Sequence, residues 1–339
     1  ILELSEVKQS FIFDNIAEKP ALSFLRGFSS PVKVMPFQSK EDLIFLMQHD
    51  SDSFVRWDAS LQLSCMVIFE VLTCLQQGET PVVDPGYITA FKAILSDKET
   101  DPALLALAIT LPAERYLTLQ QDTIDVDNLF AARNFVRCEI ADQCTTELFE
   151  VYTENNQQGS YTIDARAMGR RALKNRVLGY LTCATKNNQQ WIDLCVEQYK
   201  TSENMTDTIA ALATVVETTS EMRETLLAAF YEKWQKDPLV LDKWFSIQAT
   251  SSHTDTLSHV KTLLGNPSFS MANPNKVRSL IGAFASGNHI RFHGKNGDGY
   301  VFLANCILAL NITNPQIAAR LSTAFSSWKK YDPERQALM

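Results

Sequence analysis

The sequence predicts a mainly α-helical protein, a curved stack of helix pairs of the HEAT or armadillo type, preceded by a few β-strands. Apolar stripes with helical spacing follow one another from about residue 39 onward, without a comparable strand pattern. The connections between these stripes are short, which favours antiparallel neighbours in a layered superhelix. No exact repeat occurs at a fixed period, so we expect degenerate layers.

The first 35 residues differ from the rest and are expected to be strands. The stretch "ILELSEVKQSFIFDNI" is rich in β-branched and aromatic residues, and "LSFLRGFSSPVKV" carries Gly27 and Pro31. Two or three strands do not form a stable sheet alone. We therefore predict that residues 1–35 end a β-sandwich domain and that residues 36–339 form an all-α domain.

Helix starts and ends are predicted from capping residues. Residues 39–42, "SKED", have the outline of a capping box, and residues 54–75 carry one apolar stripe between a cap at Asp52 or Ser53 and a stop at Gly78. Further stripes predict helices over 87–97, 101–111, 125–155, 161–185, 188–199, 204–215, 217–235, 237–249, 255–265, 274–286, 299–311 and 314–329.

Two of these helices begin with the same signature, an Asn N-cap followed by Pro at the first helical position, at 273–274 and 314–315. In the second helix, Gln316 and Arg320 are four residues apart and share a face. Periodicity alone favours a solvated polar face for this pair.

Composition excludes several classes of partner. The chain has 339 residues, 45% of them hydrophobic, which suits about two domains with a substantial core. Its net charge of −8 argues against nucleic acid and anionic membranes as partners. The longest apolar runs fall short of the roughly 20 residues that span a bilayer, so we expect no membrane segment. The abrupt start in "ILELSEVKQ" suggests a fragment of a longer polypeptide.

The cysteines indicate a reducing compartment. All seven are scattered, and none forms a Cys-x-x-Cys pair. Most lie in apolar helical stretches such as "LSCMVIF", so they are expected to be small buried side chains rather than disulfides or metal ligands. A cytoplasmic location follows from this pattern.

His289 and His293 have the four-residue spacing of a zinc-binding helix. A catalytic zinc helix also needs a glutamate directly after the first histidine, and that position is Ile290. Turn dipeptides follow in "GKNGDG". We favour a surface turn with two solvated histidines over an independent zinc site.

Several stretches together resemble the C-terminal part of aminopeptidase N, a gluzincin zinc metallopeptidase family, in its soluble bacterial and plant-like branch. They occur in order along the whole chain: "LRGFSSPVKV", "TLPAERYL", "NMTDTIAALA", "DPLVLDKWFSIQA", "NPNKVRSLIGAFA", "GDGYVFLAN" and "NPQIAARL". The family's zinc helix, its glutamate ligand and its substrate amine loop have no match here.

The resemblance implies that this chain has no cofactor and no catalytic residue of its own, whereas the parent enzyme holds zinc in an N-terminal catalytic domain. The partners would be the catalytic and β-domains of the same parent chain and peptide substrates. By similarity, Gln316 and Arg320 would line the substrate channel, where a guanidinium can bind a peptide carbonyl or carboxylate. Arg278 also matches a cavity-facing position, although it could instead brace neighbouring helices.

Two functions from different classes remain open. The first is a helical domain of a zinc aminopeptidase, inactive alone, that encloses the active-site cavity and controls access of peptides, while the parent releases N-terminal amino acids. The alternative is an autonomous helical-repeat module that binds a partner protein. The isolated chain could also self-associate through apolar surface.

Overall fold

The computed structural model describes residues 3, 5–32, 34, 38–156, 161–186 and 188–339. Its α-helices within these ranges are α1 (Lys40–His49), α2 (Ser53–Gln77), α3 (Pro85–Leu95), α4 (Pro102–Ala108), α5 (Glu114–Leu119), α6 (Val126–Gln143), α7 (Thr145–Asn155), α8 (Ala165–Leu181), α9 (Asn188–Thr201), α10 (Met205–Val216), α11 (Met222–Trp234), α12 (Pro238–Ala249), α13 (Thr256–Leu263), α14 (Pro274–Val277), α15 (Ala283–Gly287), α16 (His289–Phe292), α17 (Asp298–Thr313), α18 (Pro315–Ser322) and α19 (Pro333–Leu338).

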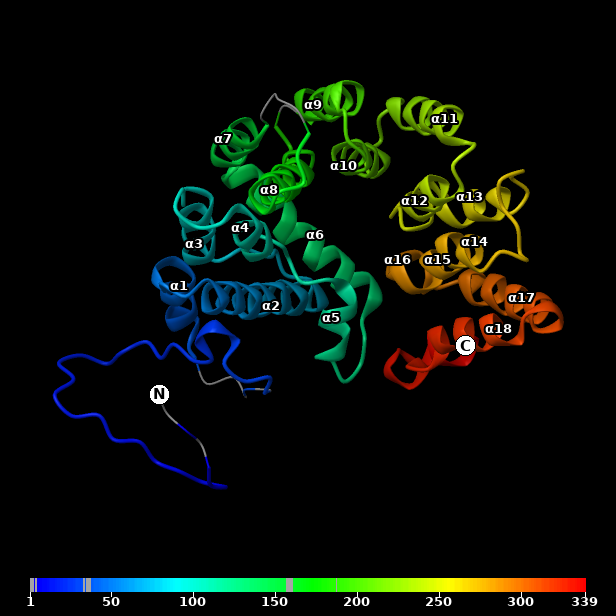
Figure 1. Ribbon diagram of the computed structural model, residues 1–339. Coiled ribbons are helices and arrows are strands. Elements are labelled where there is room, and N and C mark those ends of the chain that lie inside the picture. Colours follow the sequence, from blue (N-terminus) through cyan, green and yellow to red (C-terminus); the bar gives the residue numbers. More distant parts are fainter. Residues whose placement is uncertain (1–2, 4, 33, 35–37, 157–160, 187) are drawn as a thin grey trace.

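Most helices pack against the next helix in the chain and follow a curve, while α2 also packs on α6 and α4 on α8. Helix α1 packs on α2, α7 on α8, α9 on α10 and α17 on α18. In Figure 1 the helices pass round an arc from α1 through α9 and α11 to α18. Because each layer buries its apolar face against the next, one continuous core runs through the stack. The predicted α-helical fold class is confirmed.

The predicted capping signals are present. Asp42 and Ser39 exchange hydrogen bonds, each backbone N–H donating to the other's side-chain oxygen at 3.2 Å. Asp52 accepts from the Val55 N–H at 3.0 Å and so starts α2. Gly78 ends that helix with φ of 71°, a left-handed conformation that glycine adopts without strain.

Helix α2 is the longest element and lies inside the stack. By length and composition it could cross a membrane, although half of its most apolar window is buried within the protein. It packs against α1, α4 and α6, as a core helix does. The sequence analysis predicted this helix but considered only unbroken apolar runs, so it did not identify the helix as long and apolar enough to cross a membrane, because residues such as Ser60 and Ser64 interrupt the apolar positions.

Some predicted helices differ in the structure. The stripe over 125–155 divides at Cys144, whose φ and ψ of −116° and 17° break the helix between α6 and α7. The stripe over 314–329 ends at Ser322 and continues as short 3-10 turns. Helices α5, α16 and α19 were not predicted, because four to six residues show too little periodicity.

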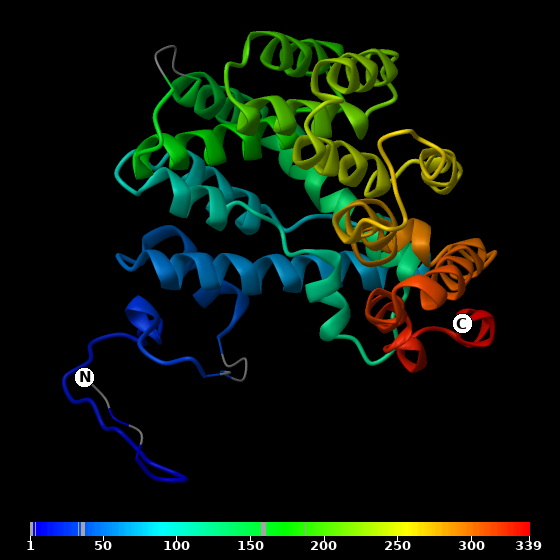
Figure 2. The ribbon, with the colours of Figure 1, turned by 45° about the vertical axis from the view of Figure 1, so that its right-hand side comes forward.

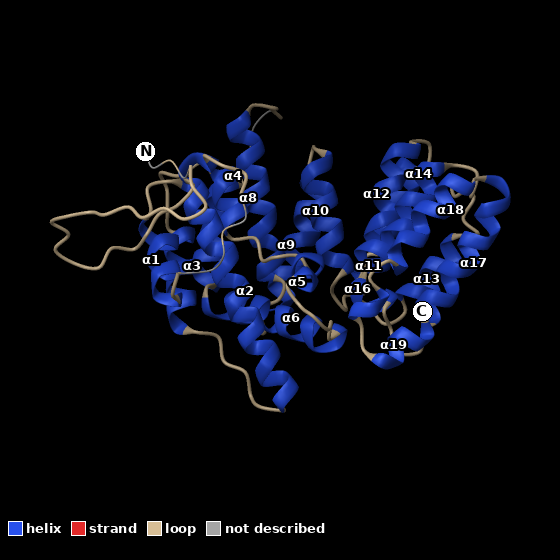
Figure 3. Ribbon diagram, turned by 90° about the horizontal axis from the view of Figure 1, so that it is seen from below, coloured by secondary structure: helices blue, strands red, loops and turns tan. Residues whose placement is uncertain are grey.

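The predicted strands do not form in the described part of the N-terminal segment, which contains only a 3-10 turn at Arg26–Phe28. A strand needs a neighbouring strand for its backbone hydrogen bonds, and the described residues supply none. The segment is held to the helices by Arg26, which pairs with Asp50 at 2.8 Å, and by the Gly27 N–H, which donates to Asp52 at 2.9 Å. Figure 3 shows it as a loop that protrudes beside α1.

The C-terminal end of the curve contacts the segment that joins α5 to α6. The Ile124 N–H donates to the Lys330 carbonyl at 2.7 Å, and Ile124 and Tyr331 form an isolated parallel bridge. The Arg335 guanidinium pairs with Asp127 at 2.8 Å. Figure 2 shows the C-terminal helices beside α5. We call this contact, between residues 118–127 and 330–335, the closure.

Candidate functional site

The predicted channel residues lie on two neighbouring elements near the C-terminus. Gln316 and Arg320 are both exposed on α18. Arg278 is exposed at the first position of a π-helical turn, Arg278–Gly282, which joins α14 to α15. Such turns are rare and occur frequently at functional sites.

The π-helical turn and α18 adjoin at a glycine. A Cβ atom placed on Gly282 would lie 3.8 Å from the Cγ atom of Arg278 and 3.9 Å from the Cδ2 atom of Leu321, the residue that follows Arg320. The glycine therefore lies between the stem of Arg278 and α18. The structure thus places the two elements that carry the predicted arginines side by side.

The side chains of Arg278, Gln316 and Arg320 form no hydrogen bond or ion pair with another described residue. The neighbouring Lys276 behaves differently, since it is buried and pairs with Asp242 at 2.8 Å. Lys276, not Arg278, therefore braces α14 against α12. The Arg278 guanidinium remains available to a ligand.

A second basic site was missed by the sequence analysis. Arg133 and Arg137 on α6 and Arg176 on α8 line one cavity of about 660 Å³, which also borders α4 and α10. We call it the arginine cavity. Arg133 and Arg137 are four residues apart and so share a helix face. That spacing of like charges, in "RNFVR", was the signal available in the sequence.

The orientation of two of these arginines is fixed by backbone carbonyls. The Arg133 Nε–H donates to the Pro112 carbonyl at 2.8 Å, and an Arg137 terminal N–H donates to the Gly179 carbonyl at 2.7 Å. Arg176 is exposed, and its side chain makes no hydrogen bond with a described residue. No carboxylate of the described chain lies within ion-pair distance of any of the three.

The two histidines that were predicted to be solvated are not, since His293 is buried and the side chain of His289 is only 16% exposed, so that prediction was wrong. His293 is 4% exposed, and its Nδ1 and Nε2 atoms lie 2.9 Å from the hydroxyls of Tyr300 and Tyr331 respectively. The Nε2 atom of His289 lies 3.2 Å from the same Tyr331 hydroxyl. Tyr331 lies about 40 residues further along the chain, so no local sequence pattern could reveal its contact with the histidines.

Burial keeps both histidines neutral. It lowers the pKa of His289 to about 4, with a smaller contribution from the positive charge of Arg335. Burial also lowers the pKa of His293 to about 2, helped by His289 and Arg335. The closest carboxylate is Glu114, 3.7 Å from the His289 Nδ1 atom, and burial raises its pKa.

The histidine pair does not form a metal site. Both ring nitrogens of His293 are occupied by tyrosine hydroxyls, which leaves no lone pair for a metal. Across the residues that the structure describes, no group of three or more His, Cys, Asp or Glu side chains is arranged to hold a metal ion. The hydrogen-bonded group of His289, His293, Tyr300 and Tyr331 therefore stabilises the closure.

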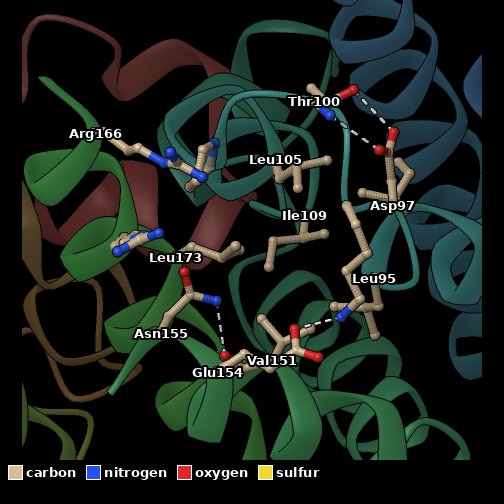
Figure 4. A pocket seen from close by; sticks show the side chains of 14 residues that line it. Leu95, Asp97, Thr100, Leu105, Ile109, Val151, Glu154, Asn155, Arg166 and Leu173 are labelled. Atoms are coloured by element: carbon tan, nitrogen blue, oxygen red, sulfur yellow. Dashed lines mark hydrogen bonds and ion pairs between the residues drawn. The ribbon is translucent and has the colours of Figure 1, made fainter. Parts of the chain in front are cut away.

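Another cavity, of about 160 Å³, lies between α3, α4, α7 and α8 (Figure 4). Three of its charged residues have partners within the chain: Lys98 pairs with Glu154, and Asp97 accepts from the Thr100 hydroxyl at 2.8 Å. Leu105, Ile109 and other apolar side chains fill its wall. This smaller cavity, in which opposite charges pair with each other, is a weaker candidate than the arginine cavity.

The fold defines a class of helical-repeat domain, and the comparison with known families agrees. The chain belongs to the family described as "Domain of unknown function (DUF3458_C) ARM repeats", which matches residues 40–339. Residues 1–36 match "Domain of unknown function (DUF3458) Ig-like fold". The second match agrees with the predicted remnant of a β-sandwich.

Two relatives and a solved structure show which known proteins the chain is similar to. The chain is 36% identical to aminopeptidase N of Haemophilus influenzae and 37% identical to aminopeptidase N of Escherichia coli, in each case over its whole length. It superimposes on Legionella pneumophila aminopeptidase A in complex with aspartic acid with a TM-score of 0.86, 32% identity and 96% of this chain covered. The predicted resemblance to aminopeptidase N is confirmed.

The chain spans only a part of these proteins. It covers 38% of the Haemophilus protein, 39% of the Escherichia coli protein and 38% of the Legionella chain. The similarity therefore relates this helical stack to one portion of larger proteins that contain other domains.

Proposed function

We propose that this chain is the C-terminal helical domain of a zinc aminopeptidase and that it encloses the active-site cavity and controls which peptides enter. The observation that supports this most directly is identity of 36% and 37% to aminopeptidases N along all of its length. The parent enzyme would release N-terminal amino acids from peptides, by attack of a zinc-activated water.

The residues of this chain do not fit the zinc of the proposed parent. Of the histidines with zinc-like spacing, His293 is buried between the hydroxyls of Tyr300 and Tyr331, and His289 contacts the Tyr331 hydroxyl. No triad of candidate ligands exists within the described ranges. The metal and the catalytic residues would belong to the N-terminal part of the parent. We expect the isolated chain to hydrolyse no aminoacyl substrate, with or without added zinc.

The helical stack supplies two properties that access control requires. Its curved, continuously packed body is rigid enough to exclude folded proteins from a chamber. Arg278, Gln316 and Arg320 are exposed and unpaired on adjoining elements, so their donors can bind the carbonyls of an extended peptide. Peptide length would thus be sensed away from the bond that is cleaved.

The decisive experiment is Arg320→Glu in the full-length parent. We expect kcat/KM for a pentapeptide to fall about tenfold more than kcat/KM for a single-residue aminoacyl substrate, because one charge-assisted hydrogen bond is lost only with the longer substrate. Arg166→Glu, at an exposed arginine on α8, is the matched control. Equal losses with both substrates would contradict the access role and favour the alternative, an autonomous interaction module.

The isolated chain should self-associate. Val301, Leu308 and Ile312 share one face of α17 and are 61%, 68% and 86% exposed. Exposed apolar faces of this kind usually contact another protein surface. Light scattering should show dimers that Ile312→Glu weakens, whereas a monomer at high concentration would contradict self-association.

We place the parent in the cytoplasm. All seven cysteines are free, and Cys65, Cys144, Cys195 and Cys306 are buried. Thiols of this kind persist in a reducing compartment. Fractionation of cells that express the parent would test the location.

A further inference from the structure

The arginine cavity concentrates positive charge that the chain does not neutralise. Arg133, Arg137 and Arg176 line one space, and no described carboxylate pairs with them. Burial lowers the pKa of Arg133. The negative charge of Glu114, which lies beyond ion-pair distance, raises this pKa, whereas the positive charges of Arg137 and Arg176 lower it further. A bound anion would relieve this repulsion.

We propose that the arginine cavity is a carboxylate-binding site and that its ligand is the free C-terminal end of a short peptide. A guanidinium presents five N–H donors in a plane that matches both oxygens of a carboxylate. Arg133 and Arg137 each give one N–H to a backbone carbonyl, which orients the group and leaves the other donors for a ligand.

The remaining walls suit a peptide. The hydroxyls of Thr110 and Thr214 donate to backbone carbonyls of their own helices, and their oxygens can still accept a hydrogen bond from a peptide N–H. Leu107 and several alanines supply apolar surface for the side chains next to the carboxylate. The volume of about 660 Å³ accommodates several residues of an extended chain.

Other anions fit less well. The net charge of −8 opposes approach of a polyanion such as nucleic acid. A free phosphate would use the arginines but not the apolar wall. These alternatives make different predictions for binding and are therefore included as arms of the test.

The test is isothermal titration calorimetry on the full 339-residue chain with three probes: tetra-alanine with a free carboxylate, tetra-alanine amide and inorganic phosphate. The free acid should bind about tenfold more tightly than the amide, since one to two charge-assisted hydrogen bonds depend on the carboxylate. Succinate, as a fourth probe, distinguishes a free small carboxylate from a peptide end.

The variants are Arg137→Gln and Arg176→Gln, with Arg166→Gln as the matched control. Arg176 and Arg166 are both exposed on α8, but only Arg176 lines the arginine cavity. We expect about tenfold weaker binding of the free acid with Arg176→Gln and a change below about twofold with the control. Because Arg176 is exposed, its substitution tests the site even if Arg137→Gln unfolds the chain.

Equal binding of acid and amide, or no binding of either, would overturn the proposal. Phosphate binding more tightly than the free acid would overturn the carboxylate assignment. Succinate binding as tightly as the peptide acid would keep the carboxylate site and overturn the peptide as its ligand. The peptide source rests on the proposed function, but the assay measures binding without turnover, so failure here and failure of the Arg320→Glu experiment are separate outcomes.

Discussion

The closure and the arginine cavity use positive charge in opposite ways. At the closure, Arg335 is 5% exposed at its side chain and pairs with Asp127 at 2.8 Å and with Asp332 at 2.7 Å. In the arginine cavity, three guanidiniums have no carboxylate of the described chain within pairing distance. Paired charges hold elements in place, whereas unpaired ones can be lost with little effect on the fold and are free for ligands.

Helix α8 shows the same contrast within two residues. Lys174 is buried and pairs with Asp207 at 2.8 Å, and Asn175 donates to the same carboxylate. Arg176 is exposed and unpaired. The comparison predicts that the stability of the fold depends on the closure, whereas ligand binding depends on the arginine cavity.

Acid should produce the largest effect, and at the closure. The folded pKa of His289 is about 4, below the ordinary 6.5, so the unfolded chain binds protons that the folded chain excludes. The stabilisation is therefore complete above pH 6.5 and is lost as pH falls from 6.5 towards 4, by roughly 3 kcal/mol per histidine at pH 4.5. Urea unfolding at several pH values measures this loss.

A double His289→Asn, His293→Asn variant is the control for this pH effect. Its free energy of unfolding should change less between pH 6.5 and 4.5 than that of the unsubstituted chain. Glu114 acts in the opposite direction, because burial raises its folded pKa, and it remains in both proteins. An identical pH dependence in the two chains would contradict the assignment to the histidines.

Arg335→Ala should lower the free energy of unfolding by about 3 kcal/mol at neutral pH. The substitution removes both ion pairs and leaves the buried His293 carbonyl without the Arg335 Nε–H, which donates to it at 2.7 Å. Lys295→Ala is the matched control, since Lys295 lies 3.5 Å from the same Asp127 but is 69% exposed. A loss below about 1 kcal/mol for Arg335→Ala would show that the closure contributes little.

Tyr331→Phe should cost about 1–2 kcal/mol, because it removes the hydroxyl that lies within hydrogen-bond distance of both His289 and His293. The ring and its packing remain. Thermal unfolding of this variant beside Tyr161→Phe, at an exposed tyrosine, measures the difference.

Arg176→Gln should have the smallest effect on stability, within about 0.5 kcal/mol of the unsubstituted chain. It breaks no ion pair with a described residue and slightly reduces repulsion of Arg133. Chemical denaturation measures this directly. A large loss would show that the arginine contributes to the fold, against the division between the two regions.

The sequence predicted those features that depend on neighbouring residues. The cap at Asp52, the capping box at Ser39 and the Asn314 helix start were all visible, because each involves side chains and backbone within a few positions. The exposure of Gln316 and Arg320 also followed from helical spacing on α18.

Features that depend on distant contacts were not predictable from local pattern. The burial of His293 results from Tyr331, and the arginine cavity forms only when α8 brings Arg176 near the two arginines of α6. The N-terminal strands were predicted from composition, but pairing requires strands that the described residues do not contain.

The closure also affects how the chain folds during its synthesis. In an open solenoid each repeat contacts only its neighbours, so folding can proceed as the chain emerges. Here Arg335 pairs with Asp127, 208 positions earlier, and Lys330 donates to the Thr118 carbonyl 212 positions away. The last helix must therefore leave the ribosome before α5 and α6 acquire their final neighbours, and a nascent chain stalled before residue 330 should remain more accessible to proteases there than the finished protein.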